Sequence, residues 1–366
     1  MPHDGPGSGD RSGGDAGRSG AGRAARSDDA AGTAAQPARA HDAPRPSRPV
    51  VLVSRPLGLG DFLTGVPAYR ALRAAFPDHE VVLAANAAFR ALVPLTGAID
   101  RLLPTTEYAP VAWTGPRPDV AVDLHGRGPQ SHDRLAALRP RRLIVFGGPT
   151  GGGYAGPVWR QDEHERARWC RLLTESGIPA DPDDLALRRP PAGSAWDAWA
   201  GATVVHPGAA SASRRWPTVR FAGLVAELSA RGHRVVVTGG PGESALVDDV
   251  AAAGARRAET AALTDLAALV AVARVVVCGD TGVAHLASAY DRPSVLLFGP
   301  TPPAEWGPPA RPHNRVLWPA PPGYRGDPHG DRVDPVLGAI HVDAVVDAVD
   351  EVLACPAARG SHDPTA

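Results

Sequence analysis

The segment from Val275 to Thr301 constrains the fold more than any other part of the sequence. A run of β-branched residues ends in a small polar turn at 278–282, where a helical pattern begins, and a second apolar run from Pro293 to Phe298 follows. This order predicts a strand–helix–strand unit of a parallel sheet. Ligands bind beyond the carboxyl ends of such strands. Because the new helix offers free N–H groups and a positive dipole end, we expect an anion there, most simply a phosphate.

The same alternation of short apolar runs and helical patterns fills most of the 366 residues, a length that suggests two domains. Before a Pro-rich linker, strands are predicted at 50–53, 81–84, 99–103, 120–124 and 143–146, and helices at 61–75, 87–94 and 162–176. After it, strands are predicted at 203–206, 234–238, 275–278 and 294–298, and helices at 218–231, 243–253, 264–273 and 282–290. The pattern predicts an α/β protein with two Rossmann-like, doubly wound parallel sheets that face a cleft.

The domain boundaries follow from composition. We predict a disordered tail at 1–48, an N-terminal domain at 49–187, a linker at 188–200, a C-terminal domain at 201–335, and a terminal helix and tail at 336–366. The tail has no Val, Ile, Leu or aromatic residue, so it cannot bury apolar surface and has no h-region of a signal peptide. The Pro-rich stretch 300–335 is expected to be irregular. We expect the helix at about 341–354 to pack back on the first domain.

The charge, the cysteine content and the apolar runs of the sequence indicate which partners and which cellular location to expect. A formal net charge of -1 argues against a nucleic-acid partner, which needs a basic face. The three cysteines are far apart and lack metal-ligand spacing, which favours a reducing, cytoplasmic location. No apolar run reaches the roughly 18 residues of a membrane span, so membrane contact is expected to be peripheral at most, at the inner face. No lysine occurs, so arginine must fill every role of a long basic side chain.

Three groups of residues are candidates for binding a nucleotide. Thr281, Gly282 and Val283 offer a hydroxyl and backbone N–H groups to a phosphate, and Asp280 would orient that loop. Arg214 and Arg215 supply cations, although a solvated pair before a helix is the alternative. In Thr238-Gly239-Gly-Pro-Gly-Glu243, the final carboxylate is placed to accept both ribose hydroxyls, or else stabilises its own helix. His285, one turn into the predicted helix, either meets the sugar or phosphate or is structural.

Four segments together resemble glycosyltransferase family 9, the ADP-heptose:lipopolysaccharide heptosyltransferases. They are Arg55-Pro-Leu-Gly-Leu-Gly-Asp61 with the following Phe62 to Pro67, His206-Pro-Gly208 through Arg214-Arg215-Trp216-Pro217, Thr238 to Glu243, and Gly279-Asp-Thr-Gly282 through His285 to Thr301. The match spans roughly residues 50 to 305, and the order and spacing of the segments are its most specific feature. The resemblance implies a GT-B fold and an inverting transferase that uses ADP-heptose.

The resemblance also implies roles for single residues. Asp61 matches the family's general base, which takes the proton of the acceptor hydroxyl, although an acidic residue there also stabilises its own helix. The helix dipole would lower the pKa of this carboxyl, so burial has to raise it again. Arg214 stands where the family usually has a lysine that contacts the sugar-phosphate region, a change that keeps the charge but alters the geometry. Arg55, Gly58, Gly60 and His125 are expected in acceptor-side loops, where His125 either touches the acceptor or caps its strand.

The function expected from all of this is transfer of a sugar, heptose in the first place, from a nucleotide-sugar donor to a hydroxyl of a glycan, glycolipid or small-molecule acceptor. The nucleotide-sugar is a substrate, and neither a cofactor nor a metal is expected, because cations and a helix dipole suffice for the diphosphate. Two rivals share the predicted fold: a sugar-nucleotide epimerase of GT-B shape, and a non-catalytic protein that binds nucleotide-sugars.

Overall fold

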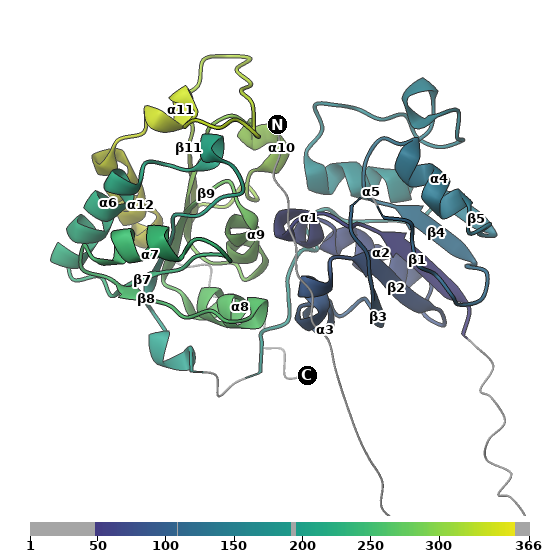
Figure 1. Ribbon diagram of the computed structural model, residues 1–366, viewed down its shortest axis with the longest axis horizontal. Helices are drawn as coiled ribbons and strands as arrows, with labels where there is room; N and C mark the ends of the chain where they lie inside the picture. Colours follow the sequence, from purple (N-terminus) through teal and green to yellow (C-terminus); the bar gives the residue numbers. More distant parts are fainter. Residues whose placement is uncertain (1–47, 108, 192–194, 356–366) are drawn as a thin grey trace, which may run out of the picture. The chain divides into compact units, whose positions relative to one another are not determined.

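The structure, a computed structural model, describes residues 48–107, 109–191 and 195–355. It contains two parallel β-sheets, one before and one after the predicted linker in the sequence (Figure 1). We call each sheet with its helices the N-terminal half and the C-terminal half. The predicted disordered tail lies outside the described residues except for Arg48, as do residues 192–194 of the predicted linker and residues 356–366.

The N-terminal half has a five-stranded parallel sheet in the order β3-β2-β1-β4-β5. Its strands are β1 (Val50–Ser54), β2 (Glu80–Ala85), β3 (Arg101–Pro104), β4 (Val120–Asp123) and β5 (Arg142–Ile144). Its α-helices are α1 (Leu59–Thr64), α2 (Val66–Ala75), α3 (Val93–Thr96), α4 (Gln130–Ala136) and α5 (Glu165–Glu175). Along β1, Val51 and Val53 share a cluster with residues of α2 and α5, whereas Leu52 shares one with Leu135 of α4. Helices therefore cover both faces, as the continuous apolar strands predict.

The predicted helix at 61–75 is divided in the structure. Gly65 ends α1 and precedes α2, and Pro67 stands in the first turn of α2, where its missing N–H costs nothing. A Cβ atom at Gly65 would lie 2.4 Å from the hydroxyl of Tyr69, so only glycine fits at the break. The consequence is that α1 is a separate short helix that carries Asp61.

The C-terminal half has a six-stranded parallel sheet in the order β11-β10-β9-β6-β7-β8. Its strands are β6 (Thr203–His206), β7 (Val235–Val237), β8 (Arg256–Arg257), β9 (Val275–Gly279), β10 (Ser294–Leu297) and β11 (Asn314–Leu317). Its α-helices are α6 (Thr218–Ala230), α7 (Ser244–Ala251), α8 (Leu263–Val272), α9 (Gly282–Ala289), α10 (Pro303–Trp306), α11 (Pro335–Gly338) and α12 (Val342–Ala354). Both sheets have the doubly wound GT-B topology expected from the sequence.

Two expectations for the end of the chain are wrong. The stretch 300–335 is not wholly irregular, because it contains α10 and the edge strand β11, which pairs in parallel with β10. The last helix does not pack on the first domain. Val345, Val346 and Val349 of α12 join a core cluster with residues of α6 and β10 of the C-terminal half, so the apolar stripe of α12 is buried there.

Each sheet reverses its strand order once, and the predicted site residues follow the strands at these reversals. In the N-terminal half the reversal lies between β1 and β4, and in the C-terminal half between β6 and β9. Arg55 follows β1, and Asp280 follows β9. Since the carboxyl ends of parallel strands at such a point form a crevice, the topology predicts where a ligand pocket should lie.

Candidate active site

A pocket of about 410 Å³ joins residues of both halves, and we call it the central pocket. The N-terminal half contributes Gly58, Leu59, Gly60 and Asp61 to its lining. The C-terminal half contributes Ala210, Arg214, Asp280, Thr281, Gly282, His285, Pro300, Thr301, Glu305, Trp306, Arg325, Gly326, Pro328 and His329. The expected base and the expected phosphate loop therefore line one cavity, although they are far apart in the sequence.

The phosphate loop is built on the N-terminus of α9. Thr281 is the N-cap, and its hydroxyl oxygen accepts a hydrogen bond from the N–H of Val283 at 3.2 Å. The N–H of Val283 is therefore already used, and the Thr281 hydroxyl also makes a hydrogen bond with the Cys278 side chain. A Cβ atom at Gly282 would lie 2.7 Å from Cγ of Leu59, so glycine is required here for the close approach of α1. The first turn of α9 forms the positive end of the pocket.

Arg214 lies across from this turn and is held by Asp280. Its Nη2 donates to the backbone oxygen of Asp280 and lies 3.2 Å from the carboxylate Oδ2 of the same residue. Burial raises the pKa of Asp280, and the charge of Arg214 opposes that shift. Nε of Arg214 is buried without a hydrogen-bond partner among the described residues. Asp280 thus holds Arg214, and its expected role in orienting the loop stays a prediction.

Arg215 points to a different place from Arg214. It does not line the central pocket; its Nε donates to the backbone oxygen of Ala209 at 2.9 Å, and its Nη2 lies 3.7 Å from Oε1 of Glu243. The other oxygen of Glu243 accepts from the N–H of Gly240 at 2.7 Å. A Cβ atom at Gly208 would collide with this carboxylate at 2.0 Å, which explains the glycine. The two adjacent arginines therefore serve different parts of the C-terminal half.

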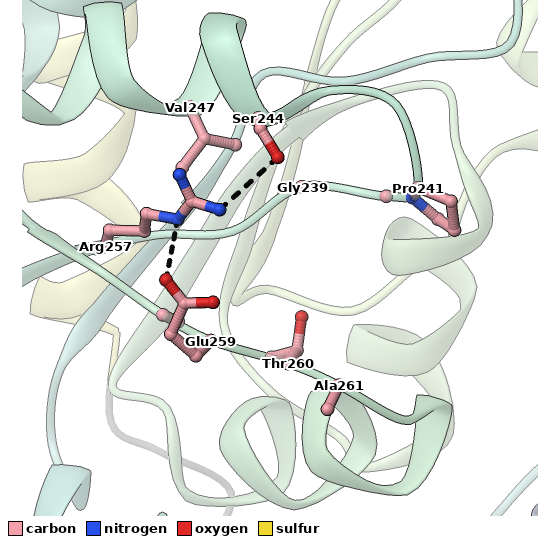
Figure 2. A pocket seen from close by; sticks show the side chains of 10 residues that line it. Gly239, Pro241, Ser244, Val247, Arg257, Glu259, Thr260 and Ala261 are labelled. Carbon is pink, nitrogen blue, oxygen red and sulfur yellow. Dashed lines mark hydrogen bonds and ion pairs between the residues drawn. The ribbon is translucent and has the colours of Figure 1, made fainter.

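A second pocket, of about 190 Å³, lies beyond the carboxyl end of β7, and we call it the β7 pocket (Figure 2). Its lining consists of Gly239, Gly240, Pro241, Ser244, Val247, Arg257, Ala258, Glu259, Thr260 and Ala261. Arg257 lies 2.9 Å from the carboxylate of Glu259 and donates to the hydroxyl of Ser244 at 3.3 Å. The predicted Thr238 is buried beside the pocket, where its hydroxyl meets Nδ1 of His206 at 2.9 Å.

Asp61 occupies the third position of α1 and keeps 23% of its side chain exposed. One carboxylate oxygen accepts from the N–H of Gly58 at 3.2 Å, and the other lies 3.3 Å from Nη2 of Arg55. Burial raises the pKa of Asp61, Arg55 lowers it, and the charge of Glu165 raises it further, so that the net shift is upward. Burial therefore outweighs the hydrogen bonds that stabilise the charged form, as a general base requires.

His285 is a neutral side chain at the junction of the halves. Burial, followed by the nearby His164 and arginines, lowers its pKa to about 3. A Cβ atom at Gly60 would lie 3.0 Å from its Cδ2, and its ring meets that of Trp306 edge-on with 5.9 Å between centroids. His285 thus offers a polar but uncharged group to the pocket.

Two of the residues expected in acceptor-side loops stand in loops after β1 and β4 but line neither of the two pockets. Arg55 is fully buried and does not line the central pocket. His125 lies outside both pockets, 3.6 Å from the carboxylate of Glu107, and its backbone N–H donates to Asp123 at 3.0 Å. Conversely, Glu305, Arg325 and the 257–261 segment line pockets without having been predicted. They belong to a Pro-rich stretch and to an edge strand of two arginines, where the sequence has no apolar periodicity to place them.

Neither a metal centre nor a membrane helix is found in the part of the chain that the structure describes. Within residues 48–107, 109–191 and 195–355, no three His, Cys, Asp or Glu side chains gather as metal ligands would. The helices of these same residues are too short or too polar to cross a bilayer. That the reaction needs no metal stays a prediction.

In the comparison with known proteins, the matching family model and the similar curated proteins are all heptosyltransferases. The model of glycosyltransferase family 9 (heptosyltransferase) matches residues 162–322. Lipopolysaccharide heptosyltransferase 3 of Escherichia coli is 31% identical over 162 residues, which are 41% of this chain and 46% of that protein. Lipopolysaccharide heptosyltransferase 1 of Pseudomonas aeruginosa is 32% identical over 160 residues, 42% of this chain and 44% of that protein. The chain thus aligns with about half the length of the curated relatives it matches.

The structural similarity extends further than the sequence similarity. The E. coli ADP-heptose lps heptosyltransferase II has a TM-score of 0.66 at 20% identity and covers 83% of this chain and 98% of its own. The E. coli heptosyltransferase WaaC with ADP has a TM-score of 0.63 at 19% identity and covers 83% and 99%. These likenesses show the fold. The sequence match adds that residues 162–322 are similar to glycosyltransferase family 9 (heptosyltransferase).

Proposed function

We propose that the protein is an inverting glycosyltransferase that moves a sugar from a nucleoside-diphosphate donor to a hydroxyl group of an acceptor. The donor proposed is ADP-heptose, because heptosyltransferases named in the comparisons were solved with ADP and with an ADP-heptose analogue. The acceptor proposed is a glycan, a glycolipid or a small molecule with a free hydroxyl. The protein would act in the cytoplasm, with peripheral contact to the membrane if the acceptor is a lipid.

The observation that carries this proposal is the composition of the central pocket. It holds a carboxylate of raised pKa from one half and an anion site from the other, formed by Arg214, Thr281 and the first turn of α9. A transferase needs both groups on one cavity, since the base acts on the acceptor while the cations stabilise the departing diphosphate. A protein that only bound nucleotides would need the second group alone.

The chemistry that this arrangement supports has one step. The acceptor oxygen attacks the anomeric carbon as its proton passes to the carboxylate of Asp61, and the bond from that carbon to the diphosphate oxygen breaks. The electron pair of that bond leaves with the diphosphate, whose charge Arg214 and α9 stabilise. The β7 pocket lies beside Glu243 and is proposed to hold the nucleoside, with Glu243 accepting from the ribose.

The test combines a ligand panel with one substitution. Calorimetry and thermal shift of the full chain with ADP, UDP, GDP, dTDP and ADP-heptose should show selective stabilisation by ADP and ADP-heptose. With ADP-heptose and a panel of hydroxyl acceptors, the wild type should release ADP. The Asp61→Asn protein should bind ADP unchanged but turn over about 10²–10⁴-fold more slowly, because it lacks the base.

Each alternative gives a different result. Conversion of the sugar-nucleotide without release of ADP would indicate an epimerase. Tight binding without any turnover would indicate a binding protein. A fully active Asp61→Asn protein would overturn the assignment of the base, and a preference for UDP, GDP or dTDP would overturn that of the donor.

A further inference from the structure

Arg55 is a buried arginine that contacts both the backbone and the carboxylate of Asp61. It follows β1 and is completely buried, and its guanidinium donates to the backbone oxygens of Asp61 and Leu124. Its Nη2 is shared among three groups: Oγ1 of Thr64 at 3.0 Å, Oδ1 of Asp61 at 3.3 Å and Oε1 of Glu165 at 2.9 Å. One cation therefore serves two carboxylates, and it lies closer to the one that does not line the central pocket.

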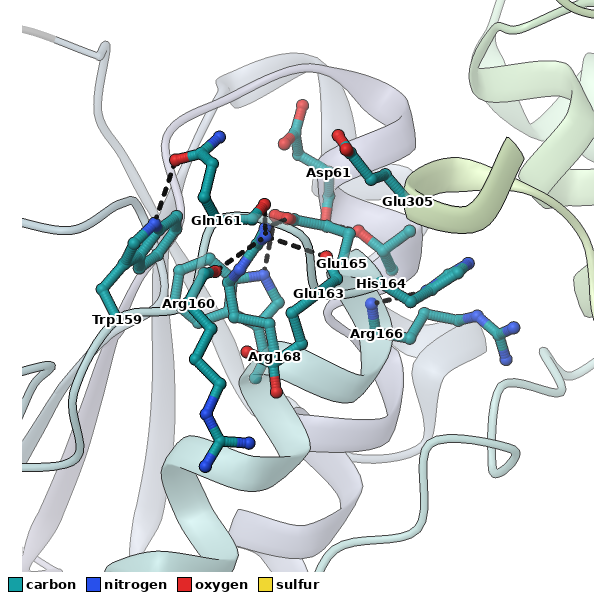
Figure 3. Close-up of polar contacts among 12 residues, drawn as sticks. Asp61, Trp159, Arg160, Gln161, Glu163, His164, Glu165, Arg166, Arg168 and Glu305 are labelled. Carbon is teal, nitrogen blue, oxygen red and sulfur yellow. Dashed lines mark hydrogen bonds and ion pairs between the residues drawn. The ribbon is translucent and has the colours of Figure 1, made fainter. Parts of the chain in front are cut away.

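Glu165 is the second carboxylate. It does not line the central pocket, and its hydrogen-bond partners are Arg55, Arg168 and Trp169. It begins α5 and is buried, with Oε1 accepting from Nε1 of Trp169 at 2.8 Å as well as from Arg55. Its other oxygen pairs with Nη1 of Arg168 (Figure 3). Arg168 is anchored in turn, since its Nη2 donates to the backbone oxygen of Glu163 at 2.8 Å. Burial would raise the pKa of Glu165, but Arg55 and Arg168 lower it, so it stays charged.

The position of Arg55 is further restricted by an aromatic ring. Its Cζ lies 4.9 Å from the ring centroid of Trp169, the same residue that donates to Glu165. A cation over an aromatic face is attracted to it, so Trp169 and Glu165 both hold the guanidinium on the side of α5. Burial alone would lower the pKa of Arg55, but Glu165 and Asp61 raise it, so this arginine keeps its charge.

The division of Arg55 between two carboxylates matters for a base. A guanidinium that closes on a carboxylate with two parallel hydrogen bonds stabilises the charged form strongly and lowers its pKa. Asp61 instead has a single, longer contact with Arg55, and part of its carboxylate faces the pocket. Without the charge of Glu165, Arg55 would lose its shorter ion pair, and its charge would no longer be divided between two carboxylates.

We propose that Glu165 is a positioning residue for Asp61: by holding Arg55 on the α5 side, it keeps the Asp61 carboxylate open to the central pocket. This proposal rests on the proposed function, in which Asp61 is the base. The remaining titratable and charged groups around Asp61 are Tyr69 of α2 below it, and across the pocket Arg214, Asp280, His285, Glu305, Arg325 and His329. None of these contacts Arg55 by a hydrogen bond among the described residues.

The test measures the titration of the Asp61 carboxyl directly, without substrate. The full chain is labelled with ¹³C at aspartate carboxyl carbons, and the Asp61 signal is assigned as the one missing from Asp61→Asn. In Glu165→Gln, which keeps the shape but removes the charge, the Asp61 titration should move to lower pH. In Arg168→Gln, which removes one of the two cations that neutralise the charge of Glu165, it should move to higher pH. The two opposite directions separate an electrostatic role from general loosening.

A conservative variant provides the matched control. Glu165→Asp shortens the side chain as a structural disturbance but keeps the charge, so the Asp61 titration should stay closer to the wild type than in Glu165→Gln. If Glu165→Gln does not fold, the direction of the shift in Arg168→Gln decides. In both variants that shift the titration, the acid limb of any kcat/KM profile should move with it.

The proposal is overturned if Asp61 titrates unchanged or at higher pH in Glu165→Gln, or at lower pH in Arg168→Gln. Because the readout needs no reaction, it is independent of the proposed function. Titration shifts of the predicted sign in a protein without transferase activity would refute the function alone. Normal transfer with no such shifts would refute the positioning role alone.

Discussion

At the scale of single residues, the two adjacent arginines after β6 differ in their surroundings, and we expect only Arg214 to contribute strongly to ligand binding. Arg214 lines the central pocket and is held by Asp280, whereas Arg215 is 44% exposed and lies near Glu243. Both carry the same charge, so a difference between them would come from position. Arg214 is also the residue for which the resemblance implies a lysine in the family, and its fork contacts both the backbone and the side chain of Asp280.

We expect Arg214→Gln to weaken ADP binding about 10- to 100-fold, the equivalent of losing a charged hydrogen bond of about 1.5–3 kcal/mol. Arg215→Gln, the matched control, should weaken it less than about threefold, because an exposed charge is worth little. Calorimetry with ADP measures both. Equal losses in the two variants would show that Arg214 has no special contact with the diphosphate.

The sequence could place Asp61 and Arg214 because each follows a strand at a recognisable turn. It could not reveal Glu165, since 110 positions separate it from Arg55 and only the folded chain brings the two together. For the same reason the sequence indicated an acceptor-side loop for Arg55 but not its complete burial. A cation beside two carboxylates is stable when buried, but a single sequence does not show which carboxylates those are.

At the scale of elements, α1 and α9 pack closely against each other because position 282 in α9 is a glycine. A methyl group at Gly282 would lie 2.7–2.8 Å from Cγ, Cβ and Cδ2 of Leu59. These are not the mobile end of a long side chain, so a helix would have to move. The same helix start carries the phosphate loop, and therefore packing and binding are coupled at this position.

We expect Gly282→Ala to destabilise the protein by about 1–3 kcal/mol through overpacking, and to weaken ADP-heptose binding as well. Adding Leu59→Ala should recover only part of both losses, because it removes Cγ and Cδ2 of Leu59 but leaves its Cβ 2.8 Å from the new methyl group. Gly223→Ala in α6 is the control, because its Cβ would lie at an ordinary 3.7 Å from Val342. Denaturant unfolding and calorimetry are the measurements; a Gly282→Ala protein as stable as the control would contradict the packing argument.

Most helices and strands could be predicted because their apolar residues follow the period of each element. The exceptions have physical causes. Strand β11 has only partly buried residues and lies at the sheet edge after a Pro-rich segment, so its sequence does not alternate clearly. For α12 the helix itself was predicted correctly, but not its partner, because an apolar stripe indicates that a helix is buried without indicating against which surface.

At the scale of the whole molecule, buried neutral histidines connect stability to pH. Burial lowers the pKa of His206 to about 4, against 6.5 for the free side chain, although Glu243 opposes the shift. Between these values the unfolded chain binds a proton that the folded chain does not. Stability is therefore lost as the pH falls from about 6.5 towards 4. Buried aspartates with raised pKa values, such as Asp280, act in the opposite direction.

We expect His206→Asn to remove the loss of stability that His206 causes at low pH. Between pH 7 and pH 5, the unfolding free energy of the wild type should therefore fall by on the order of 2 kcal/mol more than that of the variant. Comparing the two proteins cancels the contribution of the aspartates. Urea unfolding at both pH values measures the change. A gap that stays constant with pH would show that His206 titrates normally in the folded protein.

The two-sheet architecture was the most predictable property of the molecule, because repeated alternation of strands and helices leaves few other folds. The central pocket was predicted in its main groups but not in its far wall, which the 305–329 segment supplies. No local pattern marks that wall, because it is made by the short helix α10 and by irregular chain near 325–329, next to the hydrogen bond from the N–H of Ser213 to the oxygen of Gly330 at 3.1 Å.

The two pockets differ in which half lines them: the β7 pocket is lined by the C-terminal half alone, and the central pocket is lined by both halves. A donor that fills both would therefore act as a bivalent cross-link. Its nucleoside end would be anchored first, and its sugar end would then meet α1 at an effective concentration set by geometry rather than by the solution. The proposed reaction would cut that cross-link, because the sugar would leave with the acceptor and only the nucleotide would stay behind. Turnover would thus release the tie between the halves in the same event that makes the product.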